Sequence, residues 1–392
     1  MPKRTHRGQT AVVGVGETTY YKRGQSPDAE FKLTLIAILE ACKDAGIDPK
    51  DIDGFSSYSN DRNEPTRLAA ALGTKELRFS SMQWGGGGGG ASGAVANAVA
   101  AIMAGMSDIV VVFRSLAQGQ FQRFGQGAQM NRISGQMAYT MPYGLMSPAQ
   151  MFAMRCIRFM HDYDVKQETF RNIAMACYHH AQNNPRAVMH GRPLTEQKYD
   201  DSRWIVEPFH LYDCCQENDG AAALILVSAE KAKDFKSPVH ILSAASGSEH
   251  RAGAPVHNNP TYATSSFTSV APHLYEVAGV TAKDVDVIQS YENFTGGVVM
   301  SLVEHGFCEP EEVNEALKLE NLLAPNGKIP LNTSGGNLAE CYMHGLGLNI
   351  EAVRQVRGES SNQVKDVNIS MVTSGPMVSP VSSCIFGSED TL

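Results

Sequence analysis

Apolar and polar positions along the chain follow two patterns, one typical of strands and one typical of helices. Short, nearly continuous apolar runs predict buried strands at Ala11–Gly16, Ile109–Phe113, Asp219–Val227 and Val367–Val372. Longer periodic segments predict helices at Ala94–Gly105, Ser147–Tyr163 and Lys166–Asn183. The Ser147-Pro148 pair has the residue types that begin a helix. Alternation of helices with strands favours a layered α/β architecture.

Two segments of the chain repeat each other. Residues 45–58 read AGIDPKDIDGFSSY, and residues 278–291 read AGVTAKDVDVIQSY. In both copies the end of a helix leads through a short turn into a strand, and the strand ends near a tyrosine, Tyr58 or Tyr291. Ala, Gly, Lys, Asp, Asp, Ser and Tyr recur at the same spacing, which is more agreement than chance comfortably gives. The repeat implies a duplicated α/β unit.

The repeat divides the chain into an N-terminal half at residues 1–235 and a C-terminal half at residues 236–392. Each half carries a glycine-led helix before an apolar strand, at Gly89–Gly105 and at Gly335–Arg357. The first half also contains an insertion at about residues 115–210 that is rich in Gln, Met, Tyr and Gly. A compact domain does not carry so long a segment without purpose, so we expect the insertion to fold over the active site. Its methionines suit a broad apolar ligand or core packing equally well.

A run of glycines, Gly85 to Gly90, precedes the first of these helices. A glycine-rich loop that feeds a helix N-terminus brings backbone N–H groups and the positive end of the helix dipole close to a ligand. Such a place can stabilise negative charge or activate a nucleophile. No nucleophile is present, because Gly90 stands where a reactive side chain is expected. The run could also be a flexible loop or a place where the backbone of a dimer mate approaches.

Composition excludes several classes of protein. The net charge is -8 and no Lys/Arg run stands out, so nucleic acid is not expected as a partner. No stretch of about 18 uninterrupted apolar residues is present, so we expect no membrane span. The basic N-terminus lacks the apolar region of a secretory signal. The eight cysteines form no CxxC pair, which predicts no zinc site and reduced thiols in a cytoplasmic protein.

Four short motifs, in their order and spacing, resemble the thiolase superfamily. They are Val13-Gly14-Val15-Gly16-Glu17-Thr18, Asp213-Cys214-Cys215-Gln216-Glu217-Asn218-Asp219-Gly220-Ala221-Ala222-Ala223, Tyr291-Glu292-Asn293-Phe294 and Gly335-Gly336-Asn337-Leu338-Ala339. Over nearly its whole length the chain is similar to sterol-carrier-protein-type thiolases and to the lipid-transfer-protein aldolases of bacterial steroid side-chain degradation. The resemblance implies a thiolase fold of five layers, α-β-α-β-α, built from two similar halves and usually dimerised through a sheet edge.

The chain departs from thiolases at the four positions that carry thiolase chemistry. Gly90 stands at the nucleophilic cysteine, Tyr291 at the Asn or His that heads the YENF motif, and Tyr342 at the histidine of GGxxxxGH. The second catalytic cysteine falls near Gly375. Thioester exchange needs a thiolate, so we do not expect thiolase activity. The lipid-transfer-protein aldolases combine the thiolase fold, no catalytic cysteine and a pair of tyrosines, as this chain does.

The aldolase resemblance implies retro-aldol cleavage of a 3-hydroxyacyl-CoA, with a 17-hydroxy steroid carboxyl-CoA giving a ketosteroid and propionyl-CoA. We expect Tyr291 and Tyr342 to share the acid and base roles. A tyrosine base needs neighbours that favour the phenolate, which the helices led by Gly90 and Gly336 could supply. Backbone N–H groups near Gly90 and Gly375 could hold the enolate oxygen. No metal or organic cofactor is expected.

Each candidate residue also has a structural interpretation. A tyrosine at a strand end is often a packing residue, and Tyr58 in the first repeat shows that such a tyrosine can be architectural. His344 could set the ionisation of Tyr342 and contact substrate, or it could be a surface or capping residue. Cys341 and Cys384 would be the nucleophiles of an alternative cysteine-dependent acyltransferase, although a buried inert thiol is the more common state.

A non-catalytic acyl-CoA-binding subunit is the third alternative. The resemblance also implies a small partner protein with an OB-fold and a zinc ribbon. A homodimer of this chain would then form the core of a heterotetramer, in which the partner shapes the substrate channel.

Overall fold

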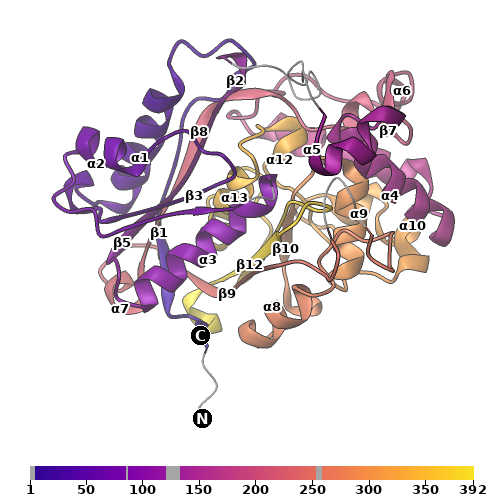
Figure 1. Ribbon diagram of the computed structural model, residues 1–392. Coiled ribbons are helices and arrows are strands. Elements are labelled where there is room, and N and C mark those ends of the chain that lie inside the picture. Colours follow the sequence, from indigo (N-terminus) through magenta and orange to yellow (C-terminus); the bar gives the residue numbers. More distant parts are fainter. Residues whose placement is uncertain (1–4, 85–86, 121–132, 253–257) are drawn as a thin grey trace.

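The computed structural model describes residues 5–84, 87–120, 133–252 and 258–392 (Figure 1). In these residues ten strands join one mixed sheet. Its main path runs through β10 (Val287–Ser290), β11 (Ile369–Ser374), β12 (Val381–Gly387), β9 (Val239–Gly247), β1 (Thr10–Glu17), β8 (Asn218–Ser228), β5 (Ile109–Ala117), β3 (Gly54–Tyr58) and β4 (Phe79–Gln83). The short β2 (Tyr21–Lys22) pairs with β8, and β6 (Trp204–Val206) pairs with β7 (Phe209–His210) in a separate sheet.

The sheet repeats one strand order on both sides of its centre. β1, β8, β5 and β3 are neighbours in that order, with two antiparallel pairs followed by a parallel pair. β9, β12, β11 and β10 follow the same order and the same directions. The two sets join where β1 pairs with β9, at Ala11–His240 and Val12–Val239. The predicted boundary between residues 235 and 236 falls between β8 and β9 and stays a prediction.

The repeated segments adopt the same local structure. α1 (Glu30–Ala45) and α8 (Ala271–Ala278) each end at a left-handed glycine, Gly46 with φ 72° and Gly279 with φ 69°. Glycine reaches this conformation without a steric penalty, which ends the helix. A single 3-10 turn then leads into β3 or β10. Tyr58 closes β3, and Tyr291 directly follows β10.

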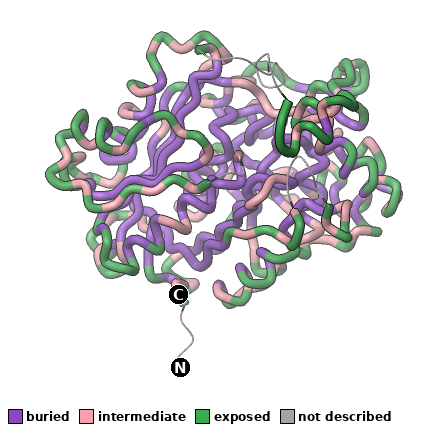
Figure 2. Tube along the Cα trace, in the orientation of Figure 1, coloured by how far each residue is buried: buried purple, intermediate pink, exposed green. Residues whose placement is uncertain are grey.

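Helices form three layers around the two halves of the sheet. α3 (Gly90–Met103) and α13 (Leu346–Arg357) lie in the middle, because each contacts strands of both halves and their apolar residues share one cluster with them. α1 covers the outer face of the first half, beside α2 (Pro65–Leu72) and α7 (Ala229–Ala232). α8 and α9 (Thr295–Glu304) cover the outer face of the second half. The predicted five-layered α-β-α-β-α fold is present, and buried residues gather at its centre (Figure 2).

The insertion packs beside the second half of the molecule. α4 (Pro148–Tyr163) begins at a capping box formed by Ser147 and Gln150, as the Ser-Pro signal predicted. α5 (Gln167–Asn183) and α6 (Glu196–Asp200) follow. α4 contacts α9, and α5 contacts α9, α10 (Val313–Ala316), α11 (Leu319–Leu322) and α12 (Gly336–Ala339) (Figure 1). Part of the insertion, residues 121–132, lies outside the described residues.

The long helix expected at Gly335–Arg357 is in fact two helices. α12 is a single turn of four residues, and α13 begins only at Leu346. Between them, His344 has φ 54° and Gly345 has φ 89°, and these left-handed values interrupt a right-handed helix. α3, in contrast, is a single helix that begins at Gly90, one residue after the expected glycine-led start at Gly89 and ahead of the periodic stretch from Ala94. Among the described residues, no helix has the length and apolar character needed to cross a membrane.

Candidate active site

The two candidate tyrosines meet in the interior of the molecule. The hydroxyl oxygens of Tyr291 and Tyr342 are 2.9 Å apart and form a hydrogen bond. Their ring centroids are 6.3 Å apart, with an interplanar angle of 66°. The side chains come from different loops, since Tyr291 follows β10 and Tyr342 lies between α12 and α13. Only 2% of Tyr291 and 5% of Tyr342 is exposed, so the pair is enclosed.

Two glycines leave the space that the Tyr291 ring occupies. A Cβ atom built on Gly88 would lie 2.2 Å from that ring, and a Cβ atom on Gly345 would lie 2.5 Å from it. Both distances are far below van der Waals contact, so any larger residue would push the ring away. Gly88 belongs to the glycine run of the first half, and Gly345 precedes α13. The tyrosine pair is therefore held where the two halves meet.

Burial controls the protonation of the pair. Loss of hydration raises the pKa of Tyr291 and of Tyr342 well above the ordinary value for a tyrosine, because the charged phenolate loses most from burial. The neighbouring tyrosine raises the pKa of Tyr291 further. Both hydroxyls are thus neutral near pH 7. This differs from the sequence-based expectation of neighbours that favour the phenolate.

His344 lies beside the pair. Its ring centroid is 5.5 Å from that of Tyr342 and 5.9 Å from that of Tyr58. Burial, followed by the charge of Arg114, lowers the pKa of His344 well below its ordinary value, so its ring is neutral. Its Nδ1 atom is buried and has no hydrogen-bond partner among the described residues. Tyr58 is architectural at this point, because its hydroxyl donates a 2.9 Å hydrogen bond to the backbone oxygen of His344.

Gly90 and Gly375 lie on two segments that touch. Gly90 is the first residue of α3, and a Cβ atom on it would lie 2.5 Å from the Cβ of Tyr58. A Cβ atom on Gly375 would lie 2.1 Å from the backbone N of Gly89. The first turn of α3 also bonds to the end of β11, through the 2.9 Å contact of the Ser92 and Ser374 hydroxyls. Gly85 and Gly86 lie outside the described residues.

Sequence reasoning missed the residues that brace the two tyrosine segments. Asn218 accepts a 2.8 Å hydrogen bond from the backbone N–H of Tyr342 through its side-chain oxygen. Glu292 accepts two hydrogen bonds of 2.9 Å from Asn337, one from its backbone N–H and one from its side-chain amide. All three stand inside the recognised motifs. Their place in the motifs could have marked them as candidates, but the sequence does not show which residues each of them contacts.

Comparisons with known proteins agree with this geometry. Residues 247–388 match the family model of the thiolase C-terminal domain. The chain is 38% identical to a steroid side-chain-cleaving aldolase of Thermomonospora curvata, over 97% of this chain and 98% of that protein. It is 36% identical to a 17-hydroxy-3-oxo-4-pregnene-20-carboxyl-CoA lyase of Mycobacterium tuberculosis, over 97% and 99%. The chain belongs to the thiolase-like aldolases.

A solved structure supports the same family membership. The structure of the Ltp2-ChsH2(DUF35) aldolase superposes on this aldolase with a TM-score of 0.92 at 36% identity, covering 99% of this chain and all of that one. The thiolase fold predicted from the sequence is thereby confirmed.

The two cysteines considered as alternative nucleophiles are poorly placed for such chemistry. Cys341 and Cys384 are buried, and burial raises the pKa of both thiols well above the ordinary value. For Cys341 the nearby carboxylates of Glu340 and Glu17 raise the pKa further. A thiol that resists ionisation is a weak nucleophile, so the structure gives no support to a cysteine-dependent acyltransferase.

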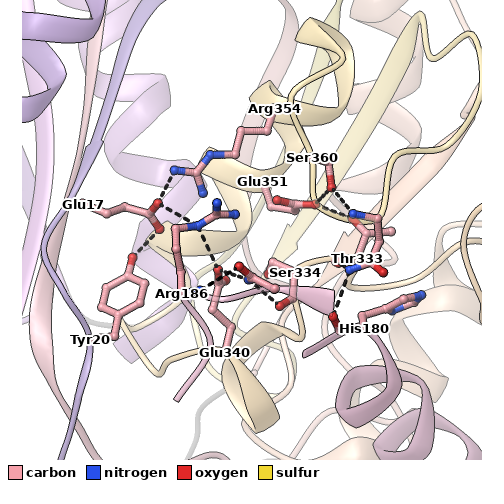
Figure 3. A network of polar contacts seen from close by, with 12 residues as sticks. Glu17, Tyr20, His180, Arg186, Thr333, Ser334, Glu340, Glu351, Arg354 and Ser360 are labelled. Atoms are coloured by element: carbon pink, nitrogen blue, oxygen red, sulfur yellow. Dashed lines mark hydrogen bonds and ion pairs between the residues drawn. The ribbon is translucent and has the colours of Figure 1, made fainter. Parts of the chain in front are cut away.

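A charged network includes Glu340, two residues before Tyr342 in the chain (Figure 3). Glu17 at the end of β1 forms an ion pair with Arg354 of α13 and accepts a hydrogen bond from Tyr20. Arg186 lies 3.8 Å from Glu17 and 3.9 Å from Glu340. Burial raises the pKa of Glu340 to about 8, and the charge of Glu17 adds to this. The network ties the first half, the insertion and the second half of the aldolase together.

The described clefts lie away from the tyrosine pair. One, of about 1100 Å³, is lined by Glu17, Arg186 and Arg354 of the charged network, among other residues. Another, of about 740 Å³, lies on the insertion and is lined mainly by aromatic and apolar side chains, including Tyr139, Tyr143 and Met154. No cluster of three His, Cys, Asp or Glu side chains suited to a metal occurs in the described part of this aldolase.

Proposed function

We propose that this aldolase cleaves a 3-hydroxyacyl-CoA by a retro-aldol reaction, with Tyr291 and Tyr342 as the catalytic residues. The proposed substrate is a 17-hydroxy steroid carboxyl-CoA, and the products are a ketosteroid and propionyl-CoA. The observation that carries the proposal is the 2.9 Å hydrogen bond between two buried tyrosine hydroxyls. The names of the relatives at 36% and 38% identity support the carbon–carbon lyase activity and the steroid substrate.

The neutral tyrosine pair suits a proton relay. In the cleavage, the substrate hydroxyl gives up its proton as the carbon–carbon bond breaks, and the electrons of that bond form a thioester enolate. The enolate then takes a proton at its α-carbon. One tyrosine can accept the hydroxyl proton while its own proton passes to the second tyrosine, which protonates the α-carbon. The relay needs no standing phenolate, in keeping with the raised pKa values of both groups, and it moves one proton without loss or gain.

The surroundings of the pair suit the negative charge of the enolate. α3 begins at Gly90, and the first N–H groups of a helix lack partners within the helix. The segment of Gly375 touches the start of α3. We assign the enolate oxygen to backbone N–H groups of these two segments. The buried Nδ1 of His344, which has no described partner, is assigned to a polar atom of the substrate. No cofactor takes part in the proposed reaction.

We also propose that the active form contains a second protein. The related solved structure is named as an Ltp2-ChsH2(DUF35) aldolase, which supports a small partner protein. The proposed partner has an OB-fold and a zinc ribbon, as the family resemblance implies. The proposed assembly is a homodimer of this chain with one partner on each protomer. Its location in the cytoplasm is part of the same proposal.

Product analysis tests the proposed function. The chain, co-expressed with its small partner, is incubated with a 17-hydroxy steroid carboxyl-CoA, and the products are identified by mass spectrometry. We expect equal amounts of ketosteroid and propionyl-CoA. Their formation should need no added free CoA and should be unaffected by iodoacetamide. Activity that requires free CoA and is lost on alkylation would contradict the proposal. Tight binding of the acyl-CoA without turnover would also contradict it and identify a carrier subunit.

A further inference from the structure

A buried carboxyl group on the residue next to Tyr291 in the chain has no part in the proton relay. Glu292 follows Tyr291 in the chain, and none of its side chain is exposed. In the described part of the chain it forms no ion pair with a lysine or arginine. Removing a carboxylate from water without a cation as partner costs free energy. A residue kept at this cost must be required for its position or its bonds.

Three hydrogen bonds join the side chain of Glu292 to other segments of the chain. Its Oε1 accepts a 2.9 Å hydrogen bond from the backbone N–H of Asn337, and its Oε2 accepts another, also of 2.9 Å, from the Asn337 side chain. The thiol of Cys177 on α5 donates to Oε1 at 3.6 Å. Gly336 makes this approach possible, because a Cβ atom there would lie 1.7 Å from Oε1. The clamp formed by Glu292 and Asn337 therefore needs glycine at the preceding position.

The clamp joins the two segments that carry the tyrosines. Glu292 is adjacent to Tyr291, and Asn337 lies on α12, the turn that leads into Tyr342. A third segment reinforces the connection from the other side. The backbone N–H of Cys215 donates to the oxygen of Asn293 at 3.0 Å, and that of Gln216 donates to the oxygen of Asn337 at 3.1 Å. A shift of the clamp would change the separation of the two tyrosine hydroxyls.

We propose that Glu292, held by Asn337, is a positioning residue that sets the geometry of the Tyr291–Tyr342 pair. The inference rests on the proposed function, because it concerns the same reaction. Proton transfer between two hydroxyls depends steeply on their distance, and a displacement of about 1 Å can cost about 100-fold in rate. The substrate does not need to touch Glu292, so substrate binding is largely independent of the clamp.

Exchange of donor and acceptor across the clamp provides the test. Asn337→Asp removes the side-chain amide donor and places a second carboxyl group against Glu292, whose pKa burial already raises to about 7. The two carboxyl groups must repel each other or share a proton, and neither arrangement reproduces the original bond. We expect kcat to fall at least about tenfold with little change in KM. Glu292→Gln in the same chain restores a donor opposite the new acceptor, so the double variant should recover to within about threefold of wild type. Asn172→Asp is the matched control, because it removes a 3.1 Å bond to the oxygen of Leu317 far from the tyrosines.

Three further results decide between the possible outcomes. If Asn337→Asp does not fold, Asn337→Ala, which keeps the backbone N–H, is used, and the same fall in kcat is expected. A folded variant with unchanged kcat, or a double variant no better than Asn337→Asp, would overturn the positioning role. Tyr342→Phe is measured alongside: if it is fully active, the proposed function fails, whereas an inactive Tyr342→Phe with an active Asn337→Asp overturns only the role of Glu292.

Discussion

At the candidate site, aromatic rings pack against glycines, which have no side chain to obstruct them. Gly88 and Gly345 leave room for the ring of Tyr291, and Gly90 leaves room for Tyr58. The absence of a nucleophile at Gly90 thus has a packing reason as well as a chemical one. Tyr58 in turn holds the backbone of His344. These glycines therefore make room for aromatic side chains, which is a different role from that of a flexible loop.

A cysteine reintroduced at position 90 should therefore fail to restore thiolase chemistry. Its Cβ atom would lie 2.5 Å from that of Tyr58, and overpacking of this kind costs about 1–3 kcal/mol. We expect Gly90→Cys and the control Gly90→Ala to lower the free energy of unfolding equally in urea titrations, with no acyl exchange in either. Measurable acyl exchange in Gly90→Cys, with wild-type stability, would contradict this packing argument.

At the scale of elements, the repeated segments were predictable because their signals are local. A glycine that ends a helix and an apolar run that forms a strand are visible in the sequence, and β3 and β10 lie where the repeat places them. The break between α12 and α13 was not predictable. His344 takes φ 54° in the interior of the fold, and only tertiary contacts stabilise that backbone conformation. The same loop carries Tyr342, so sequence reasoning singled out Tyr342 as a candidate but did not predict the backbone that supports it.

Histidine burial between elements predicts a loss of stability in acid. At the end of α9, His305 bonds to the oxygen of Ser301 at 2.8 Å and to Ser383 of β12 at 3.1 Å. Burial lowers the pKa of His305 to about 4, below the 6.5 of an unfolded histidine. As the pH falls, His305 therefore takes up a proton in the unfolded chain before it does so in the folded chain. The contribution of neutral His305 to the free energy of unfolding is complete above pH 6.5 and is lost as the pH falls toward 4.

Urea titrations at pH 7 and pH 5 measure this loss. We expect the free energy of unfolding of wild type to fall with pH more steeply than that of His305→Gln, by up to about 1.4 kcal/mol per pH unit. His305→Gln itself should be less stable than wild type at pH 7, because it loses the packing of the buried imidazole ring. Equal slopes for the two proteins would contradict a neutral, buried His305.

At the scale of the whole molecule, the two halves are joined by the short β1–β9 pairing, by the central helices and by the charged network. Glu17 belongs to the first half and Arg354 to the second, and their side chains are 4% and 14% exposed. Breaking a buried pair on one side leaves a charge without its partner, which costs about 3–5 kcal/mol. Composition alone could not reveal this connection, since charged residues are ordinarily expected at the surface.

Removal of one partner of this pair should therefore destabilise the protein more than removal of both. We expect Arg354→Met to lower the free energy of unfolding by about 3 kcal/mol, because Arg186 and Tyr20 compensate only in part. The double variant Glu17→Gln with Arg354→Met should lose less. The result is read from urea denaturation at pH 7. A double variant that is at least as unstable as Arg354→Met would show that the pair itself stabilises the junction of the two halves.

The central claim is that two tyrosine hydroxyls in contact move the proton of a retro-aldol cleavage. Its most direct test is the kcat of Tyr291→Phe and Tyr342→Phe, each with the small partner, compared with wild type. Tyr275→Phe is the control, because it removes the hydroxyl of a half-buried tyrosine, bonded at 2.8 Å to the oxygen of His305. The account predicts that each active-site variant folds and loses about 100-fold or more in kcat, while the control keeps its activity. Wild-type turnover in either active-site variant would contradict it.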